Sequence, residues 1–305
     1  MSSTLLKRIL KRIKQRLRTF YFLNFRKYIR ISSAPFISGD TFRKYADHVM
    51  DEVSSFKIED VKNFDKIFIK SDFLNNFIQN YLNKINKKVV VLVHNSDFSF
   101  EKTHAEKFNE KKILVFSQNL DFEYKNYENI YPLPIGIENR SYFMNGKLGN
   151  FKKIIDKKLP KSDSKLILCA FNPNTNPERI NILKLSSKNK LISFLRFSSH
   201  KEFLMEVSKH KFNLCPEGNG IDTHRFWESL MVGTIPIVKN SYLIQNFISF
   251  GVPCFVLDKW SDLNQLTEEM LNDYYEKNIN NLQQNKSYYF SFWKDIIENK
   301  LNNLV

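Results

Sequence analysis

The stretch FNLCPEGNGIDTHRFWESLMVGTIPIV, residues 212–238, has the pattern of one strand–loop–helix–strand unit. Residues 212–215 are a short apolar run typical of a buried strand, and a polar loop with two glycines follows it. Residues 223–232 carry apolar side chains at helical spacing, and Gly233 is a typical helix terminator. The apolar run IPIV after the glycine predicts the next strand. A unit of this kind is the building block of a parallel sheet.

The same alternation recurs along the chain. Other apolar runs of strand length lie at 66–70, 89–93, 113–116, 131–137, 166–171, 191–197 and 254–257. Segments of helix length separate them, which predicts an α/β fold with two Rossmann-like halves. The lysine-rich stretch 145–165 is the best linker candidate between the halves. We therefore expect four parts: a basic arm (1–30), an N-terminal domain (31–155), a C-terminal domain (156–265) and closing helices (266–305).

The charge of the chain is very uneven. The formal net charge is +15 for 305 residues, and residues 1–30 hold ten Lys and Arg without one acidic residue. The remaining 275 residues carry 37 basic and 32 acidic side chains, a balance of only +5. This distribution argues against a continuous groove that tracks phosphates, so we expect no nucleic-acid partner.

The basic arm has the pattern of an interfacial helix. One apolar stripe recurs at three- and four-residue spacing, while cations occupy the other face: Leu5, Leu6, Ile9, Leu10, Ile13, Leu17 and Phe20. Such a helix suits the headgroup region of an anionic membrane, which predicts peripheral attachment through residues 1–20. No uninterrupted apolar stretch follows the cations as in a signal peptide, and no run is long enough to span a bilayer. A basic helix packed on the body or a nucleic-acid arm is the alternative.

The three cysteines, Cys169, Cys215 and Cys254, lie in apolar contexts without C-x-x-C spacing. They are typical of buried free thiols, which indicates a reducing compartment and no zinc site.

The loop and helix start of residues 216–228 combine groups that suit a nucleotide diphosphate. Gly218, Asn219 and Gly220 form a loop whose backbone can approach a ligand, and the following helix offers free N–H groups to an anion. His224 and Arg225 add cations in the first turn. Glu228 lies one turn further, where a carboxylate can accept hydrogen bonds from a ribose diol.

Less specific interpretations exist for the same residues. A lone G-x-G is weak evidence, and Arg225 with Glu228 could be a surface ion pair. Thr223 replaces the third glycine of the dinucleotide fingerprint and no acidic residue follows about twenty positions later, so NAD is disfavoured. The motifs of phosphate-loop NTPases, elbow-type esterases and zincins are absent from the sequence.

Residues 212–238 resemble the donor-site signature of exostosin-like glycosyltransferases: a strand, a glycine loop, an Arg-bearing helix start, "WE" and G-x-[IV]-P-[IV]. Shorter stretches, "VHNSD" and "LPIGIEN" among them, are reminiscent of bacterial surface-polysaccharide enzymes. The resemblance implies a GT-B fold, a nucleotide-sugar donor in the C-terminal domain and inversion at the anomeric carbon. By position, Arg225 would contact the diphosphate and Glu228 the ribose. Glu217 departs from the pattern, because relatives often carry Arg there.

The chemistry of sugar transfer extends these expectations. The leaving nucleotide diphosphate gains negative charge, so cations and helix N–H groups aimed at it lower the barrier. The sequence has no D-x-D triplet for a GT-A metal site, and we expect no metal and no cofactor. Arg179, in the loop after the first strand of the C-terminal domain, is a second phosphate candidate. A surface arginine is the alternative for Arg179.

An inverting transfer also needs a base from the N-terminal domain. Asp97 is our first candidate and His94 the second, because both follow the buried run at 89–93; Asp40 is a more remote one. Helix capping is the alternative role for His94 and Asp97.

The sequence thus predicts a glycosyltransferase that uses a UDP-sugar and extends a saccharide or lipid-linked acceptor of a surface glycan, on the inner face of the cytoplasmic membrane. The alternatives are a fucosyltransferase-like enzyme that uses GDP-fucose, a non-catalytic membrane-bound scaffold, and a nucleic-acid-binding protein supported by charge alone.

Overall fold

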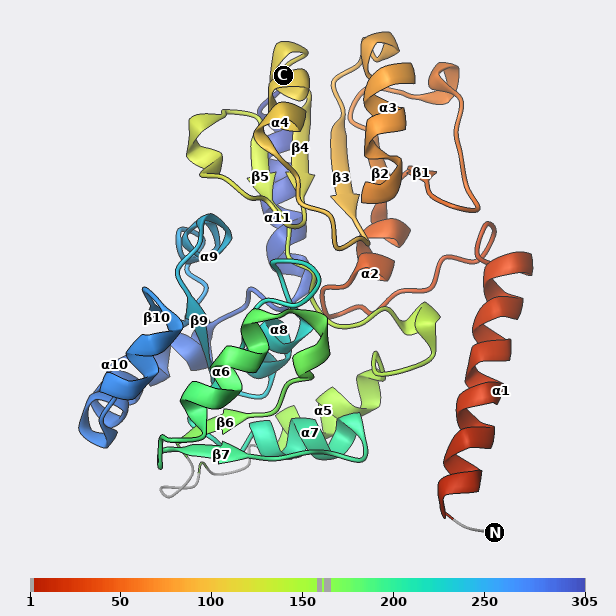
Figure 1. Ribbon diagram of the computed structural model, residues 1–305. Coiled ribbons are helices and arrows are strands. Elements are labelled where there is room, and N and C mark those ends of the chain that lie inside the picture. Colours follow the sequence, from red (N-terminus) through yellow and green to blue (C-terminus); the bar gives the residue numbers. More distant parts are fainter. Residues whose placement is uncertain (1–2, 158–160, 162–165, 305) are drawn as a thin grey trace.

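The computed structural model describes residues 3–157, 161 and 166–304, and it has two α/β halves, drawn one above the other in Figure 1. The first half is built on a parallel sheet with the strand order β1-β2-β3-β4-β5. Its strands are β1 (His48–Met50), β2 (Lys66–Lys70), β3 (Val90–His94), β4 (Leu114–Ser117) and β5 (Ile130–Pro132).

The second half is built on another parallel sheet, with the order β10-β9-β8-β6-β7. Its strands are β6 (Ile167–Cys169), β7 (Ile192–Phe194), β8 (Phe212–Leu214), β9 (Ile235–Lys239) and β10 (Phe255–Leu257). The order reverses between β6 and β8, and ligands of open parallel sheets bind where such a reversal opens a crevice. The predicted α/β fold with two parallel sheets is confirmed.

Helices cover the two sheets. In chain order they are α1 (Ser3–Asn24), α2 (Gly39–Tyr45), α3 (Leu74–Asn80), α4 (Lys102–Glu110), α5 (Leu148–Lys157), α6 (Glu178–Ser186), α7 (His200–Val207), α8 (His224–Met231), α9 (Tyr242–Ile248), α10 (Glu268–Gln284) and α11 (Phe290–Asn302). Within the described residues, no helix combines the length and the apolar character needed to cross a membrane. Gly233 follows α8 with a φ of +74°, a backbone conformation that glycine adopts without strain.

Two elements differ from the sequence prediction. β1 was not expected, because its three residues give no periodic signal. The stretch 145–165 is not a simple linker, since α5 occupies residues 148–157 and buries Phe151 and Ile154 against the core. Its lysines at 152 and 153 face solvent, so the polar composition hid an amphipathic helix. The rest of that stretch, apart from Lys161, lies largely outside the described residues.

The last helix connects the two halves. α11 follows the second sheet in sequence but lies against β4 of the first sheet. At its start, Phe290 packs edge-on against Phe42 of α2, with 5.7 Å between ring centroids. One turn later, Trp293 contacts Trp227 of α8 at 6.4 Å. The strands of the first sheet point with their carboxyl ends toward the second half (Figure 1), so the loops that follow them reach the boundary between the halves.

Candidate active site

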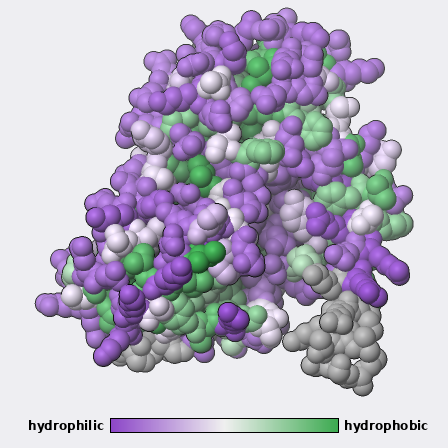
Figure 2. All heavy atoms as spheres, in the orientation of Figure 1, coloured by the Kyte–Doolittle hydropathy of each residue, from purple (hydrophilic) through white to green (hydrophobic). Residues whose placement is uncertain are grey.

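A cleft of about 910 Å³ lies between the two halves. The first half contributes the loops after β3 and β5, and the second half contributes the loops after β6, β7 and β8 with the first turns of α7 and α8. Hydrophilic atoms cover much of the surface between the halves in the space-filling view (Figure 2). The cleft brings together these residues that the sequence singled out: Asp97, Arg179, Gly218, Asn219, Gly220, His224, Arg225 and Glu228.

The glycine loop after β8 presses against the first half. A Cβ atom on Gly220 would lie 3.0 Å from Asn119 Nδ2 and 3.3 Å from the backbone of Asp97. A Cβ on Gly218 would meet Arg179 at 3.4 Å, an ordinary contact distance. The missing side chain at Gly220 therefore allows a close approach of the two halves beside the cleft.

The N-terminus of α8 opens into this cleft. The cap residue Thr223 makes no side-chain hydrogen bond to the helix, so it leaves the first-turn N–H groups of α8 available to a ligand. His224 lies next to it, and one ring nitrogen, Nδ1, contacts the carbonyl oxygen of Gly136 at 2.7 Å. That bond crosses from α8 to the first half and leaves Nε2 of His224 as its second ring nitrogen.

Arg225 provides a cation that forms no ion pair with a carboxylate of the described residues. Its Nη2 donates to the carbonyl of Ala170 at 3.0 Å, and its Nε is buried without a hydrogen-bond acceptor. The guanidinium lies 5.5 Å from the centroid of the Phe203 ring. Burial lowers the pKa of Arg225 from its usual value, although an arginine remains charged at neutral pH. Such an unpaired cation is a good site for an anion.

Arg179 of α6 lies beside it as a second cation. Its guanidinium donates to the carbonyl oxygens of Glu217 (2.6 Å), Pro216 (2.9 Å) and Asn172 (2.9 Å). These bonds tie the loop after β6 to the loop after β8. Burial, and then the charge of Arg225, lower the pKa of Arg179 to about 10. Arg179 is therefore no solvated surface arginine; it shapes both loops of the cleft and adds positive charge.

Glu228 is bound by a histidine that the sequence analysis missed. His200, the first residue of α7, contacts Glu228 Oε1 through Nε2 at 2.7 Å. Burial would raise the pKa of Glu228, but the charge and hydrogen bond of His200 keep it below its usual value. Burial would lower the pKa of His200, but the charge and hydrogen bond of Glu228 raise it above its usual value. No hydrogen bond among the described residues engages Glu228 Oε2. The alternative of a surface ion pair between Arg225 and Glu228 does not hold, because Glu228 is buried and pairs with His200.

Asp222 is a second residue that the sequence reasoning missed. Its Oδ2 accepts the N–H of Ile135 from the first half at 2.7 Å, and its Oδ1 accepts Trp227 Nε1–H at 3.0 Å. Its own N–H donates to Asn119 Oδ1 at 3.0 Å. Burial raises the pKa of Asp222 to about 7. The sequence pattern around Asp222, a single acidic residue in a glycine loop, does not predict hydrogen bonds to the other half.

A second, smaller pocket of about 330 Å³ continues the cleft into the first half. It shares Asp97, Ile135 and His224 with the large cleft. Its other walls are mainly polar: Gly39, Lys70, Asp72, His94, Asn95, Ser96, Gln118, Asn139 and Tyr142. Asp97 is exposed at the junction of the two chambers, and no hydrogen bond among the described residues engages its carboxylate.

The other base candidates are placed differently. His94 is buried at the end of β3, with Nε2 bonded to the carbonyl of Pro134 at 3.0 Å and Nδ1 accepting the N–H of Asn95 at 2.7 Å. Burial lowers the pKa of His94 to about 4, so the ring is neutral at neutral pH. Asp40 is buried and both its oxygens accept bonds from Ser141, at 2.7 and 2.8 Å. Glu138, from the quoted LPIGIEN stretch, lines the cleft and was not singled out.

The cysteines and potential metal ligands were also part of the sequence prediction. Cys169, Cys215 and Cys254 are free and buried, as the sequence predicts. In the part of the chain that the structure describes, no three His, Cys, Asp or Glu side chains are grouped as metal ligands.

Comparisons with known proteins give remote similarities only. No protein-family model and no curated protein matches the chain. Among solved structures, the chain is similar to an α,α-trehalose-6-phosphate synthase from Burkholderia multivorans, with 9% identity over 81% of this chain and 72% of that chain and a TM-score of 0.42. It is also similar to an α1,3-fucosyltransferase with GDP-fucose, with 15% identity over 84% of this chain and 95% of that chain and a TM-score of 0.34. The resemblance of residues 212–238 to exostosin-like enzymes stays a prediction.

Proposed function

We propose that this chain is an inverting, metal-independent glycosyltransferase that takes its sugar from a nucleotide-diphosphate sugar, a UDP-sugar in the first instance. The observation that carries the proposal is that one cleft between two parallel sheets holds a cation with a buried free donor, Arg225 Nε, and a carboxylate, Glu228, whose Oε2 makes no hydrogen bond with the described residues. Arg225 and the start of α8 supply positive charge for the diphosphate, and Glu228 Oε2 supplies an acceptor for the ribose diol.

The transfer step follows from this placement. The acceptor hydroxyl attacks the anomeric carbon, the bond from that carbon to the phosphate oxygen breaks, and the nucleotide diphosphate leaves with the electron pair. Arg225 and the α8 N–H groups stabilise the charge that the leaving group gains. Asp97 takes the proton of the hydroxyl, because it lies where the cleft and the second pocket meet. The second pocket then holds the acceptor saccharide, whose hydroxyls match its amide and hydroxyl walls.

The basic arm adds an attachment to membranes. Ile13, Leu17 and Phe20 are exposed on α1, and exposed cations accompany them. We propose that α1 binds the anionic inner face of the cytoplasmic membrane as a peripheral anchor and that the acceptor belongs to a surface glycan.

The first test measures nucleotide binding. UDP, GDP and their sugar conjugates are screened by thermal shift, since a ligand that binds only the folded state raises its apparent stability. We expect Glu228→Gln to weaken binding of the nucleotide and of the nucleotide sugar alike. Arg225→Ala should reduce turnover more than binding, because its partner gains charge in the transition state. Wild-type binding and turnover in both folded variants would show that the site is elsewhere.

The second test concerns the base. Asp97→Asn should bind nucleotide normally but transfer sugar at least about 100-fold more slowly, roughly the lower end for loss of a general base. Glu138→Gln is the matched control, because Glu138 also lines the cleft but its oxygens accept bonds from Asn145 N at 3.0 Å and Nδ2 at 2.9 Å. Steady-state rates at saturating donor distinguish the two variants. Equal rates for Asp97→Asn and the wild type exclude Asp97 as the base.

A further inference from the structure

Tyr142 lies between the second pocket and α1 and contacts both. The ring of Tyr142 lines the pocket. It also stacks on Phe22 of α1, with 6.1 Å between centroids, and the guanidinium of Arg18 lies 4.5 Å from its centroid. The basic arm is therefore packed directly behind the wall of the proposed acceptor pocket.

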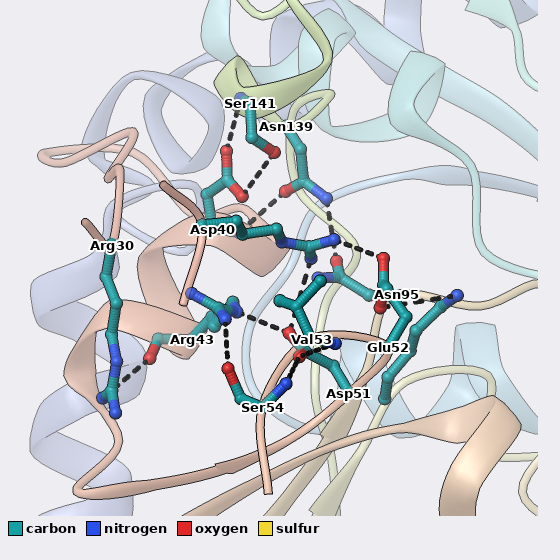
Figure 3. Close-up of polar contacts among 12 residues, drawn as sticks. Arg30, Asp40, Arg43, Asp51, Glu52, Val53, Ser54, Asn95, Asn139 and Ser141 are labelled. Carbon is teal, nitrogen blue, oxygen red and sulfur yellow. Dashed lines mark hydrogen bonds and ion pairs between the residues drawn. The ribbon is translucent and has the colours of Figure 1, made fainter. Parts of the chain in front are cut away.

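Buried ion pairs hold the end of the arm in the first half. Arg26, two residues after α1, is buried and pairs with Asp51 at 3.7 Å and with Glu52. Arg43 of α2 donates to the same Asp51 from Nε at 2.7 Å (Figure 3). A buried pair is costly to break, because the remaining charge is left without a partner. The C-terminal end of the arm is thus held against the body by contacts of Arg18, Phe22 and Arg26.

The same network reaches the walls of the pocket. Lys70, which lines the pocket, pairs with Glu52 at 3.9 Å and with Asp72 at 3.5 Å. On the other side of α2, Asn139 accepts the N–H of Asp40 at 2.7 Å and donates to Asn95 at 2.9 Å (Figure 3). Glu52 therefore contacts both Arg26, at the end of the arm, and Lys70, in the wall of the pocket.

The opposite side of α1 is uncovered. Ile13, Leu17 and Phe20 follow helical spacing on one side of the helix, and they are about half exposed, at 47%, 50% and 57%. Phe22 and Arg18 contact Tyr142 on the other side. Because α1 carries seven Lys and Arg and no acidic residue, the surface that fits this face is both apolar and anionic, which is the character of an anionic lipid leaflet.

We propose that the second pocket takes the saccharide head of a membrane-anchored acceptor, whose lipid stays in the leaflet on which α1 lies. Only the helix, about 10–12 Å across, and the Tyr142 ring separate the leaflet from the pocket. Because the C-terminal end of α1 is held against the body, the pocket keeps one distance and orientation relative to the membrane surface. An acceptor anchored in the leaflet is therefore present at the pocket at high effective concentration. This inference rests on the proposed transferase function and names the substrate class for its acceptor site.

The test compares two forms of the same acceptor sugar with the full-length chain. A hexadecyl glycoside is embedded in vesicles of phosphatidylglycerol and phosphatidylcholine, and the methyl glycoside is supplied in solution. The variants are Leu17→Asp, on the uncovered apolar side, and Gln15→Asp, which makes the same charge change on the other side of α1. Both residues are exposed, so both variants should fold as the wild type does.

We expect wild type and Gln15→Asp to transfer sugar to the embedded glycoside about tenfold faster than Leu17→Asp does. A charged side chain at position 17 weakens one apolar contact between α1 and the leaflet, and a tenfold loss corresponds to part of such a contact. Transfer to the methyl glycoside should be the same in all three proteins. Equal transfer to the embedded glycoside by the two variants, or binding of α1 to RNA instead of vesicles, contradicts the inference. If the wild type binds no nucleotide, the transferase proposal fails and the acceptor inference with it, whereas vesicle sedimentation still reports on the arm.

Discussion

At the scale of single residues, the pair of His200 and Glu228 is the most informative feature of the cleft. The two side chains come from different helices and are largely buried, with 12% and 8% of each exposed. The ring of His200 packs against Phe151 and Phe203, and its Nδ1 is buried without an acceptor. His200 is therefore placed to hold Glu228 ionised and to turn Oε2 toward the cleft.

This pair should make stability depend on pH in a defined direction. The raised pKa of His200 means that its contribution is complete below the usual histidine value of 6.5 and is lost as the pH rises through the folded-state value. The lowered pKa of Glu228 means that its contribution is complete above the usual value of 4.5 and is lost as the pH falls through the folded-state value. Between pH 4.5 and 6.5 the pair is at full strength.

We therefore expect His200→Asn to lower the free energy of unfolding by about 1–3 kcal/mol at pH 6, with a smaller loss at pH 9. Urea unfolding of both proteins at several pH values measures the difference, and the double variant with Glu228→Gln isolates the coupling between the two residues. Nucleotide binding should weaken in parallel, because Glu228 loses its fixed orientation. A loss of stability that does not vary with pH would contradict an ionic pair.

At the scale of elements, the loop after β8 both lines the cleft and packs against the first half. It offers backbone to the cleft, and it carries Asp222 and Gly220 against the first half. A loop that docks this tightly tolerates little added volume, because interfaces inside a protein are packed to near crystal density.

Gly220→Ala should consequently lower the free energy of unfolding by about 1–3 kcal/mol, the usual cost of overpacking. Asn119 and the Asp97 backbone would have to move to admit the new methyl group. Gly149→Ala in α5 is the matched control, since a Cβ there meets nothing within 4 Å, and it should be neutral or slightly stabilising. Thermal unfolding compares the two. Equal stability of Gly220→Ala and the wild type would mean that the loop does not press on the first half.

At the scale of the whole molecule, α11 makes the two halves depend on one another. Its Trp293 is fully buried and contacts Phe247 and Phe250 of the second half at 6.2 and 5.5 Å. On the same helix, Glu298 accepts a hydrogen bond from Tyr45 of the first half at 2.5 Å. The cleft lies between halves that this helix holds together.

Trp293→Ala should lower the free energy of unfolding by about 3–5 kcal/mol, as expected when a buried aromatic side chain is removed. Because α11 contacts both halves, we expect one cooperative transition at a lower urea concentration, followed by circular dichroism and by fluorescence of the remaining tryptophans. Lys294→Ala, at an exposed position next to it, should stay within about 0.5 kcal/mol of the wild type. Two separate transitions, with the first half unchanged, would contradict this role of α11.

The sequence by itself determined the α/β class, the two sheets, nearly all their strands, and the part of the cleft formed by Arg179, the glycines at 218 and 220 and the start of α8. It could do so because buried parallel strands are continuous apolar runs, and because a glycine loop before a helix is a local pattern. Only the tertiary structure decided that His200 binds Glu228, that Asp222 and Gly220 contact the first half, and that His94 lies inside the core with both nitrogens engaged. It also decided that α11 packs across both halves. The pair His200–Glu228 joins residues 28 positions apart and the pair Tyr45–Glu298 joins residues 253 positions apart, and contacts between such distant residues leave no periodic signal in the chain.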